Sequence, residues 1–433
     1  MACAFSLFPE RVLKGFNRSH FRQEVNTRAR SSNLQEHRPC LATNVIEHEL
    51  QWVMKRMSEK DDSVVVRGLR DVAAGESKIS YPDSNGALYY VGYNIDDIID
   101  RTVYEEVAYL LIHKKLPKMQ ELDKFRTELV SEMKLPDPIL KSIRTTPINC
   151  LPMDVLRTEV SHLGEYDPEG KVFSEPANMR RAARLIAQVP TIVATLYRSR
   201  REEPVPVPKN GFDLVQNFLY MLKGNFPDAN AVKVMHRLMT LHVDHGFNAS
   251  TFAARVTAST NSDMYSAVTS AIGTLKGPLH GGASEKVMEM LDDIYFEDKV
   301  EEYIQGLLDD KKKIMGFGHR VYKTQDPRTK HLRGIVEDFC YSFGTSYLYD
   351  KCKKIEKIVY DRKKIYPNVD FYAAVAMDAL GVAKEFFPLF FASSRIVGWV
   401  AHILEQYEDA VLLRPSQKYV GELGRLFVPI GQR

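Results

Sequence analysis

The sequence contains few cysteines, and they show no pattern that would pair them. Its 433 residues include five, Cys3, Cys40, Cys150, Cys340 and Cys352, and no two of them form a CxxC pair. An odd number without such spacing argues against a disulfide framework and against a cysteine-based zinc site. We therefore expect free thiols in a reducing compartment.

Long hydrophobic runs are also absent. No uninterrupted apolar run approaches the roughly 18 to 20 residues that span a bilayer. The most apolar stretch, residues 386–403, is interrupted by Ser393, Ser394, Arg395 and His402. It is predicted to be a buried helix. There is no internal repeat at a solenoid period and no low-complexity tract.

The chain has little net charge, formally +3. Its first 40 residues hold seven Lys or Arg against three Glu, a surplus of +4, so the remainder carries about −1. Because residues 41–433 are nearly neutral overall, the sequence gives no sign of the excess positive charge that is typical of nucleic-acid-binding proteins. The arginine-rich, acid-poor opening is typical of a mitochondrial transit peptide, although a disordered basic tail has the same composition. We expect a location in the mitochondrial matrix, with the cytoplasm as the alternative.

Strand patterns are scarce. Only residues 64–66 and 87–92 read as strands, with a strong turn signal at 83–86 between them. Helical periodicity is seen at 95–112, 179–197, 300–308 and 371–382. Pro190 is expected to kink or break the second of these helices. Further breaks are expected at 204–208, 224–227 and 366–367, and a helix-like segment at 45–60 precedes the body. The pattern predicts an all-α protein with a small β element near its start.

Three separated segments carry candidate catalytic groups: GPLHGGA at 277–283, GFGHRVYK at 316–323 and PNVDF at 367–371. His280 and His319 stand in glycine-rich turns, which allow a ligand to approach closely. Asp370 offers a carboxylate that can act as a base. Each residue alone has an ordinary alternative, such as a loop histidine bonded to a local carbonyl or an acid that complements a helix dipole. Their combination favours an active site.

Three arginines in short polar motifs could bind an anionic substrate: Arg328, Arg395 and Arg414. A guanidinium fork matches a carboxylate with two hydrogen bonds. Arg395 is the most informative because it interrupts an apolar helix, where a charge needs a partner. The alternative for all three is a structural ion pair.

The segment HVDHGFNASTF at 242–252 could suggest a metal site through His242, Asp244 and His245. A helix would turn Asp244 away from the face that the two histidines share. No HExxH motif or further ligand pair lies nearby, so a metal is disfavoured and none is predicted.

These motifs resemble the citrate synthase family, over a span from about Val64 to about Pro429. The resemblance implies an all-α, two-domain helical fold with a small N-terminal β element. Residues 1–62 would form the basic N-terminal extension, interpreted as a transit peptide and linker. Residues 63–281 and 385–433 would form a large dimerisation domain, and residues 282–384 a small domain. Ser284 is expected to cap the first helix of the small domain.

The resemblance also implies the chemistry, a condensation of acetyl-CoA with oxaloacetate followed by hydrolysis of the thioester. Asp370 would remove the α-proton, His280 would hydrogen-bond the thioester carbonyl, and His319 would polarise the keto group. The residues implied to bind oxaloacetate are His245, Arg328, Arg395 and Arg414, the last from the neighbouring subunit of a homodimer. Coenzyme A would be bound by Met315, Gly316, Arg320 and Lys323, although the last two basic residues could equally lie on a solvated turn. No metal or redox cofactor is expected.

Other functions stay open at this stage. A 2-methylcitrate synthase would use propionyl-CoA on the same residues, and one methylene shifts selectivity by only about 1–3 kcal/mol. The run at 262–282 looks like the shorter bacterial and archaeal citrate synthases, which favours citrate. Gly246 departs from the family, which usually has Glu after this histidine. Remoter alternatives are a metal-dependent hydrolase and an inactive helical scaffold.

Overall fold

The computed structural model describes residues 65–69, 72–342 and 344–433. Residues 73–415 form one compact unit. A second unit comprises residues 1–72 with 416–433, of which the short 3-10 turns η2 (Arg67–Leu69) and η6 (Ile430–Gln432) are described. The N-terminal extension predicted at 1–62, with its transit peptide and its helix at 45–60, lies outside the described residues.

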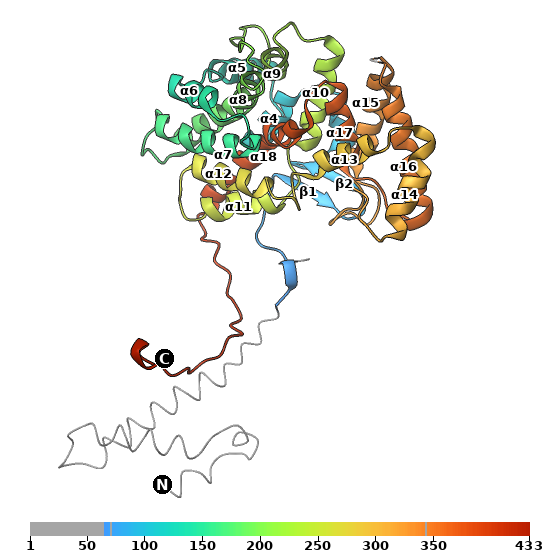
Figure 1. Cartoon of the computed structure of the whole chain (residues 1–433). Helices are drawn as coiled ribbons and strands as arrows, with labels where there is room; N and C mark the ends of the chain where they lie inside the picture. The colour runs from blue at the N-terminus through green and yellow to red at the C-terminus, as the bar shows by residue number, and fades with distance from the viewer. Residues whose placement is uncertain (1–64, 70–71, 343) are drawn as a thin grey trace, which may run out of the picture. The chain divides into compact units, whose positions relative to one another are not determined.

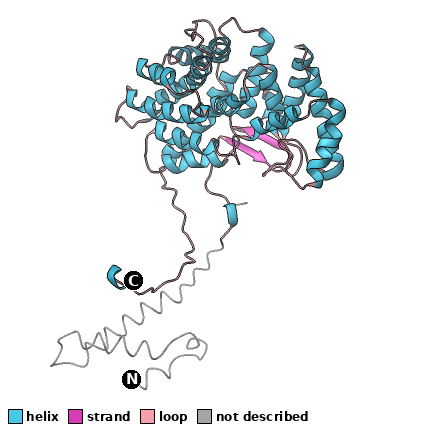
Figure 2. Cartoon of the chain, in the orientation of Figure 1, coloured by secondary structure: helices cyan, strands magenta, loops and turns pink. Residues whose placement is uncertain are grey.

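The compact unit is built mainly from helices (Figure 2). The α-helices are α3 (Ile95–Ile98), α4 (Tyr104–His113), α5 (Met119–Ser131), α6 (Asp137–Thr145), α7 (Pro152–Leu163), α8 (Glu175–Ser199), α9 (Leu214–Lys223), α10 (Ala229–His242), α11 (Ala249–Ala258), α12 (Met264–Leu275), α13 (Ala283–Asp293), α14 (Val300–Asp309), α15 (Pro327–Ser342), α16 (Ser346–Lys363), α17 (Val369–Ala379) and α18 (Phe387–Asp409). Three 3-10 turns join them: η3 (Gly164–Tyr166), η4 (Glu297–Lys299) and η5 (Lys384–Phe386). The predicted all-α class is confirmed.

A small antiparallel sheet precedes the helices, in the order β1 (Ser80–Asp83), β2 (Ala87–Tyr90), β3 (Tyr93–Asn94). The predicted turn at 83–86 closes the first hairpin, with Gly86 at φ +99° and its N–H bonded to the Asp83 carbonyl at 3.0 Å. The strand predicted at 64–66 is wrong at its two described residues. Val65 and Val66 are exposed and irregular, and no described strand pairs with their backbone groups.

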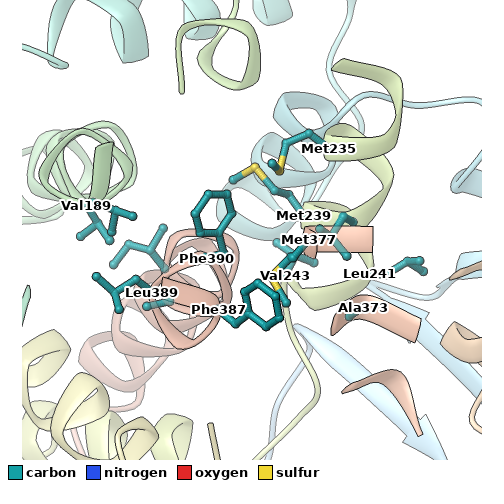
Figure 3. Close-up of a cluster of buried hydrophobic side chains, with 14 of the residues drawn as sticks. Val189, Met235, Met239, Leu241, Val243, Ala373, Met377, Phe387, Leu389 and Phe390 are labelled. Atoms are coloured by element: carbon teal, nitrogen blue, oxygen red, sulfur yellow. The ribbon is translucent and has the colours of Figure 1, made fainter. Parts of the chain in front are cut away.

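The core is organised around α18, which packs against α4, α7, α8, α10, α11 and α12. Figure 3 shows Phe387, Leu389 and Phe390 of α18 between Val189 of α8 and the methionines of α10. The helical stretch Lys384–Asp409 is long and apolar enough to cross a membrane, but 89% of its apolar window is buried inside the protein. It is a core helix, as the sequence predicts.

Three local predictions are corrected. Helix α8 does not break at Pro190, because the buried residues around the proline pack against α9 and α18 and compensate for one lost backbone hydrogen bond, while a kink there stays a prediction. The helix expected at 95–112 is two helices, α3 and α4, separated at residues 99–103. Ser284 lies inside α13, whose N-cap is Gly282, and its buried hydroxyl has no partner among the described residues.

Helices α13 to α17 pack mainly on one another and form the group at the right of Figure 1. They meet the remaining helices chiefly through α10 and α18. The division into a large domain and a small domain, with boundaries at 282 and 384, stays a prediction.

Candidate active site

Two loops far apart in the sequence are joined side by side at the start of α17. Phe317 and Pro367 form an antiparallel bridge, and Asn368 donates its backbone N–H to the Gly316 carbonyl at 2.8 Å. Gly316 (φ +78°) and Gly318 (φ +83°) lie in the left-handed region, which favours glycine. The loop that carries His319 is thereby fixed against the turn that carries Asp370.

The tautomer of His319 follows from its contacts. Its Nδ1 accepts the backbone N–H groups of Val321 at 3.0 Å and Tyr322 at 3.1 Å. Burial, with a smaller contribution from Arg328, lowers the pKa of His319 to about 4. A guanidinium nitrogen of Arg328 lies 3.5 Å from Nε2, a longer contact than the two at Nδ1. The two shorter backbone bonds therefore place the proton of the neutral ring on Nε2, which can donate to a substrate oxygen.

His245 lies next to His319, with ring centroids 5.2 Å apart. Its Nε2 is 2.9 Å from the hydroxyl of Tyr322. Burial, followed by the charge of Arg328, holds the pKa of His245 well below its usual value. Two neutral imidazoles and a phenol thus share one face of the site.

Asp370 lies in the first turn of α17, where the Asn368 side chain caps the helix by accepting the Asp370 N–H at 3.0 Å. No described residue hydrogen-bonds the Asp370 carboxylate. Burial raises the pKa of this carboxyl to about 6, while Arg328 and Arg395 lower it and Asp326 raises it. Desolvation of the carboxylate therefore outweighs the two guanidinium charges, and the direction of this pKa shift could not be read from the sequence. A half-buried carboxylate without internal donors suits a general base.

His280 is held from the other side by Ser250. Its Nε2 lies 2.8 Å from the Ser250 hydroxyl oxygen, which also accepts the indole N–H of Trp399 at 3.1 Å. Burial, with a smaller contribution from Arg395, lowers the pKa of His280 to about 4. His280 is neutral at physiological pH.

The two buried arginines among the candidate site residues, Arg328 and Arg395, differ in their partners. Arg328 forms a bidentate pair with Asp326, at 3.0 Å from Nε and 2.8 Å from Nη2, and both residues are buried. Arg395 is 1% exposed, and no described carboxylate lies within 4 Å of its guanidinium. Its Nε donates to the His242 carbonyl at 2.6 Å, and the guanidinium stacks over Phe391 at 4.7 Å. Burial lowers the pKa of Arg395 to about 10, although the charge of Asp244, which makes no direct ion pair with it, acts in the opposite direction.

The remaining predicted residues are not brought into this cluster. Arg414 is exposed in the irregular segment after α18 and contacts none of the other candidate site residues in the described structure. Arg320 and Lys323 are exposed, and the backbone of Lys323 donates to the Ser84 carbonyl at 3.1 Å. Met315 is half-buried beside the apolar core.

In the described part of the chain, one group of metal-ligating side chains has its ligand atoms within 4.8 Å of one another: Glu105, Asp213 and His236. Nδ1 of His236 accepts the Tyr104 backbone N–H at 3.2 Å, so the neutral ring has its proton on Nε2, 3.4 Å from Asp213 Oδ2. Such a ring offers no lone pair to a metal. Asp213 also caps α9, so we interpret the group as a polar link between α4, α9 and α10.

Several residues of the site received no role from the sequence: Ser250, Tyr322, Asp326 and Trp399. The first three lie within the quoted motifs or their immediate continuation, so the signal was present but carried no partner information. Trp399 lies one turn after Arg395 on α18 and gave no signal beyond an apolar helix.

Comparisons with known proteins agree on one family. A family model described as "Citrate synthase, C-terminal domain" matches residues 68–416. Citrate synthase 2 of Bacillus subtilis is 45% identical over 369 residues, 85% of this chain and 99% of that protein. The 2-methylcitrate synthase of Shewanella oneidensis is 38% identical over 368 residues, 84% of this chain and 97% of that protein.

Solved structures give the same result. Citrate synthase from Pyrobaculum aerophilum matches with a TM-score of 0.80 at 37% identity, over 85% of this chain and 95% of that one. A citrate synthase from Thermoplasma acidophilum, in a ternary complex with carboxymethyl coenzyme A and oxaloacetate, matches with a TM-score of 0.81 at 33% identity, over 86% of this chain and 100% of that one.

Proposed function

Because the chain belongs to the citrate synthase family, we propose that it condenses acetyl-CoA with oxaloacetate and hydrolyses the product thioester to citrate and coenzyme A. It is then an acyltransferase that converts the acyl group to alkyl on transfer. Its substrates are two small molecules and water, and the reaction requires no metal or redox cofactor.

The observation that supports this function best is the unpaired charge of Arg395. Burying a guanidinium without a carboxylate is costly unless an anion is supplied from outside. Oxaloacetate brings two carboxylates and a keto oxygen. Arg395 would bind one carboxylate, while His245 and Arg328 would contact the same substrate and the Nε2–H of His319 would face its keto oxygen.

The acetyl group would be activated by Asp370 and His280. Asp370 takes a proton from the methyl carbon, and His280 stabilises the negative charge that develops on the thioester oxygen. The resulting enol carbon bonds to the keto carbon of oxaloacetate, whose oxygen becomes the alcohol of citryl-CoA. Water then cleaves the C–S bond and releases coenzyme A.

The tautomer of His280 depends on the hydrogen bonds of Ser250. Trp399 can only donate to the Ser250 oxygen, so the hydroxyl proton goes either to Asn248 Oδ1 or to His280 Nε2, each at 2.8 Å. Donation to Asn248 would leave the imidazole hydrogen on Nε2, pointing to Ser250. The proposed role of His280 requires the other arrangement, in which Ser250 donates to His280 Nε2 and the imidazole hydrogen is on Nδ1, free to donate to a thioester carbonyl.

For coenzyme A we propose the loop that begins at Met315 and Gly316, with Arg320 and Lys323 facing the phosphates. Both side chains are exposed at the edge of the loop that ends at Asp326, which suits contact with a mobile, highly charged ligand.

The second candidate is a 2-methylcitrate synthase, because relatives of that name match at 38–39% identity over most of the chain. The two are separated by following coenzyme A release with oxaloacetate and either acetyl-CoA or propionyl-CoA, using the chain from about Ser63. Preference for acetyl-CoA, abolished in Asp370→Asn, supports citrate synthase. Preference for propionyl-CoA keeps the mechanism and changes the substrate, and no release with either thioester from folded protein overturns the enzymatic proposal.

We further propose that the active form is a homodimer in which Arg414 completes the neighbouring subunit's site. Its exposure and separation from the other site residues support this, since a binding residue outside its own site needs a second chain. We also propose that the basic N-terminal segment directs the chain to mitochondria. A fluorescent protein fused to residues 1–62 would be imported if this is right, and would stay in the cytosol if it is not.

A further inference from the structure

A buried polar cluster lies directly beside the segment that carries His245. Its charged and titratable members are Asp244, Arg255, His402 and Glu405, which come from three different parts of the chain and are at most 8% exposed. Burying this many polar groups is unfavourable unless each is well paired. The hydrogen bonds and ion pairs of these residues show which part of the chain the cluster holds in place.

Asp244 gathers three donors on one oxygen. Its Oδ2 accepts the hydroxyl of Ser80, the Nε2–H of His402 at 3.1 Å and the backbone N–H of Gly246 at 3.2 Å. The Oδ1 atom has no partner among the described residues and faces Gly398, where an added Cβ would approach it within 2.5 Å. Strand β1, helix α18 and the loop after α10 therefore converge on one carboxylate.

His402 is locked in one orientation. Its Nδ1 lies 3.3 Å from a guanidinium nitrogen of Arg255, which can only donate, so the proton is on Nε2 and points to Asp244. Arg255 pairs with Glu405 at 2.6 Å and lies 4.5 Å over the ring of Phe247. Phe247 in turn packs edge-on against His402 at 5.6 Å.

The cluster contacts Gly246 and Phe247, which come immediately after His245 in the sequence. Gly246 has φ +57°, and its N–H also donates to the Ser80 hydroxyl oxygen at 2.8 Å. An added Cβ would lie 3.2 Å from Pro82 of β1. The turn therefore needs both a glycine and its two acceptors, and its conformation determines where the His245 ring points.

We propose that Asp244, His402 and Ser80 are positioning residues that fix the turn at Gly246 and thereby hold His245 against Tyr322 and the oxaloacetate side of the site. This inference rests on the proposed function. It also assigns a role to the small β-sheet, because strand β1 contains both Ser80 and Pro82, the proline that packs against Gly246.

The first test compares two mild variants with a matched control. Ser80→Ala removes one donor to Asp244 and one acceptor for Gly246, and Gly246→Ala forces a side chain into the turn. Gly170→Ala is the control, since Gly170 has φ +53°, nothing within 4 Å of an added Cβ, and no part in the site. We expect the first two to raise the KM for oxaloacetate about 5- to 20-fold with less than a twofold change in the KM for acetyl-CoA, and the control to change neither. Equal effects in all three would overturn the inference.

A second readout does not depend on activity. In 15N-histidine spectra of the whole chain, Ser80→Ala and Gly246→Ala should shift the His245 signals, while Gly170→Ala should leave them unchanged. Unchanged His245 signals in Ser80→Ala contradict the proposal even if the wild-type chain releases no coenzyme A, which would separately defeat the proposed function. Asp244→Asn keeps an acceptor oxygen and should retain more oxaloacetate affinity than Asp244→Ala at matched thermal stability. Equal affinity in these two folded variants also contradicts the proposal.

Discussion

At the scale of single residues, the site depends on which groups stay charged. His280 and His319 have pKa values lowered to about 4, whereas that of Asp370 is raised to about 6. Above pH 6 the two imidazoles are therefore neutral donors and the carboxylate is an ionised base. The three groups occupy different protonation roles because burial acts oppositely on acids and bases.

This assignment predicts the acid limb of the pH profile. The kcat/KM for acetyl-CoA should fall about tenfold per pH unit below pH 6 as Asp370 protonates, with no inflection from either histidine until about pH 4. Initial rates in constant-ionic-strength buffers between pH 3.5 and about pH 9 measure it. A limb centred near pH 7 would instead implicate a histidine.

Asp370 also has a predicted cost in stability. Its folded pKa lies above the ordinary value of 3.8, so the native state binds more protons between pH 4 and 6, and stability falls as pH rises through that window. Asp370→Asn should therefore raise the free energy of unfolding at pH 7 by about 1–2 kcal/mol, a value kept small because the residue is only half-buried. The same substitution removes the base and should lower kcat by a factor of about 10²–10⁴. Urea unfolding at pH 5 and pH 7 measures the second effect, and a variant less stable at both pH values contradicts it.

Arg395 and Arg181 offer a contrast between a binding arginine and a structural one. Arg395→Met should raise the KM for oxaloacetate about 10- to 100-fold and change the free energy of unfolding by no more than about 1 kcal/mol, since it removes a buried charge without a carboxylate partner. Arg181 is buried and paired with Asp167 at 2.6 Å. Arg181→Met should lower the free energy of unfolding by about 3–5 kcal/mol and leave the KM for oxaloacetate unchanged. The reverse result would assign Arg395 to structure.

At the scale of elements, the bridge between residues 316–318 and 366–368 decides whether His319 and Asp370 meet. An added Cβ at Gly316 would lie 2.8 Å from the Val287 side chain and 2.9 Å from Phe371, at a φ of +78°. We expect Gly316→Ala to cost about 1–3 kcal/mol and to reduce kcat at least tenfold. Gly211→Ala is the control, because Gly211 has a φ of +93° and no atom within 4 Å of an added Cβ. It should lose only the stability that the unfavourable backbone conformation costs. Equal losses would mean that close packing at Gly316 is unimportant.

Element-level predictions succeeded where a signal was local and failed where packing decided. The turn at 83–86 was predictable because the sequence Asp-Ser-Asn-Gly favours a turn by itself. The helix around 300–308 was predictable because its apolar residues recur at helical spacing. The apolar residues 64–66 looked like a strand, yet a strand exists only beside a partner. Pro190 looked like a helix end, yet the packing of α8 against α9 and α18 outweighs one missing hydrogen bond.

At the scale of the whole molecule, the exposed position of Arg414 predicts a site shared between two chains. Arg414→Ala and Asp370→Asn should each be nearly inactive alone. Unfolding and refolding an equal mixture should restore about a quarter of wild-type activity, because half of the dimers are mixed and each has one intact site. Refolding each variant separately is the control. Absence of recovery in a mixture shown to contain mixed dimers would place Arg414 outside the neighbouring site.

The sequence by itself determined the family, the all-helical class and the set of chemical groups, because glycine-rich turns, lone histidines and arginines in short motifs are local features. It did not distinguish Arg328 from Arg395. Only the tertiary structure shows that Asp326 forms a direct ion pair with the first and that no described carboxylate does so with the second. The same holds for the pKa of Asp370, the hydroxyl behind His280 and the cluster behind Gly246. Charge, burial and proton position depend on what lies across a contact. Trp399, which contacts Ser250, and His402, which contacts Asp244, are more than 100 positions from those partners in the chain.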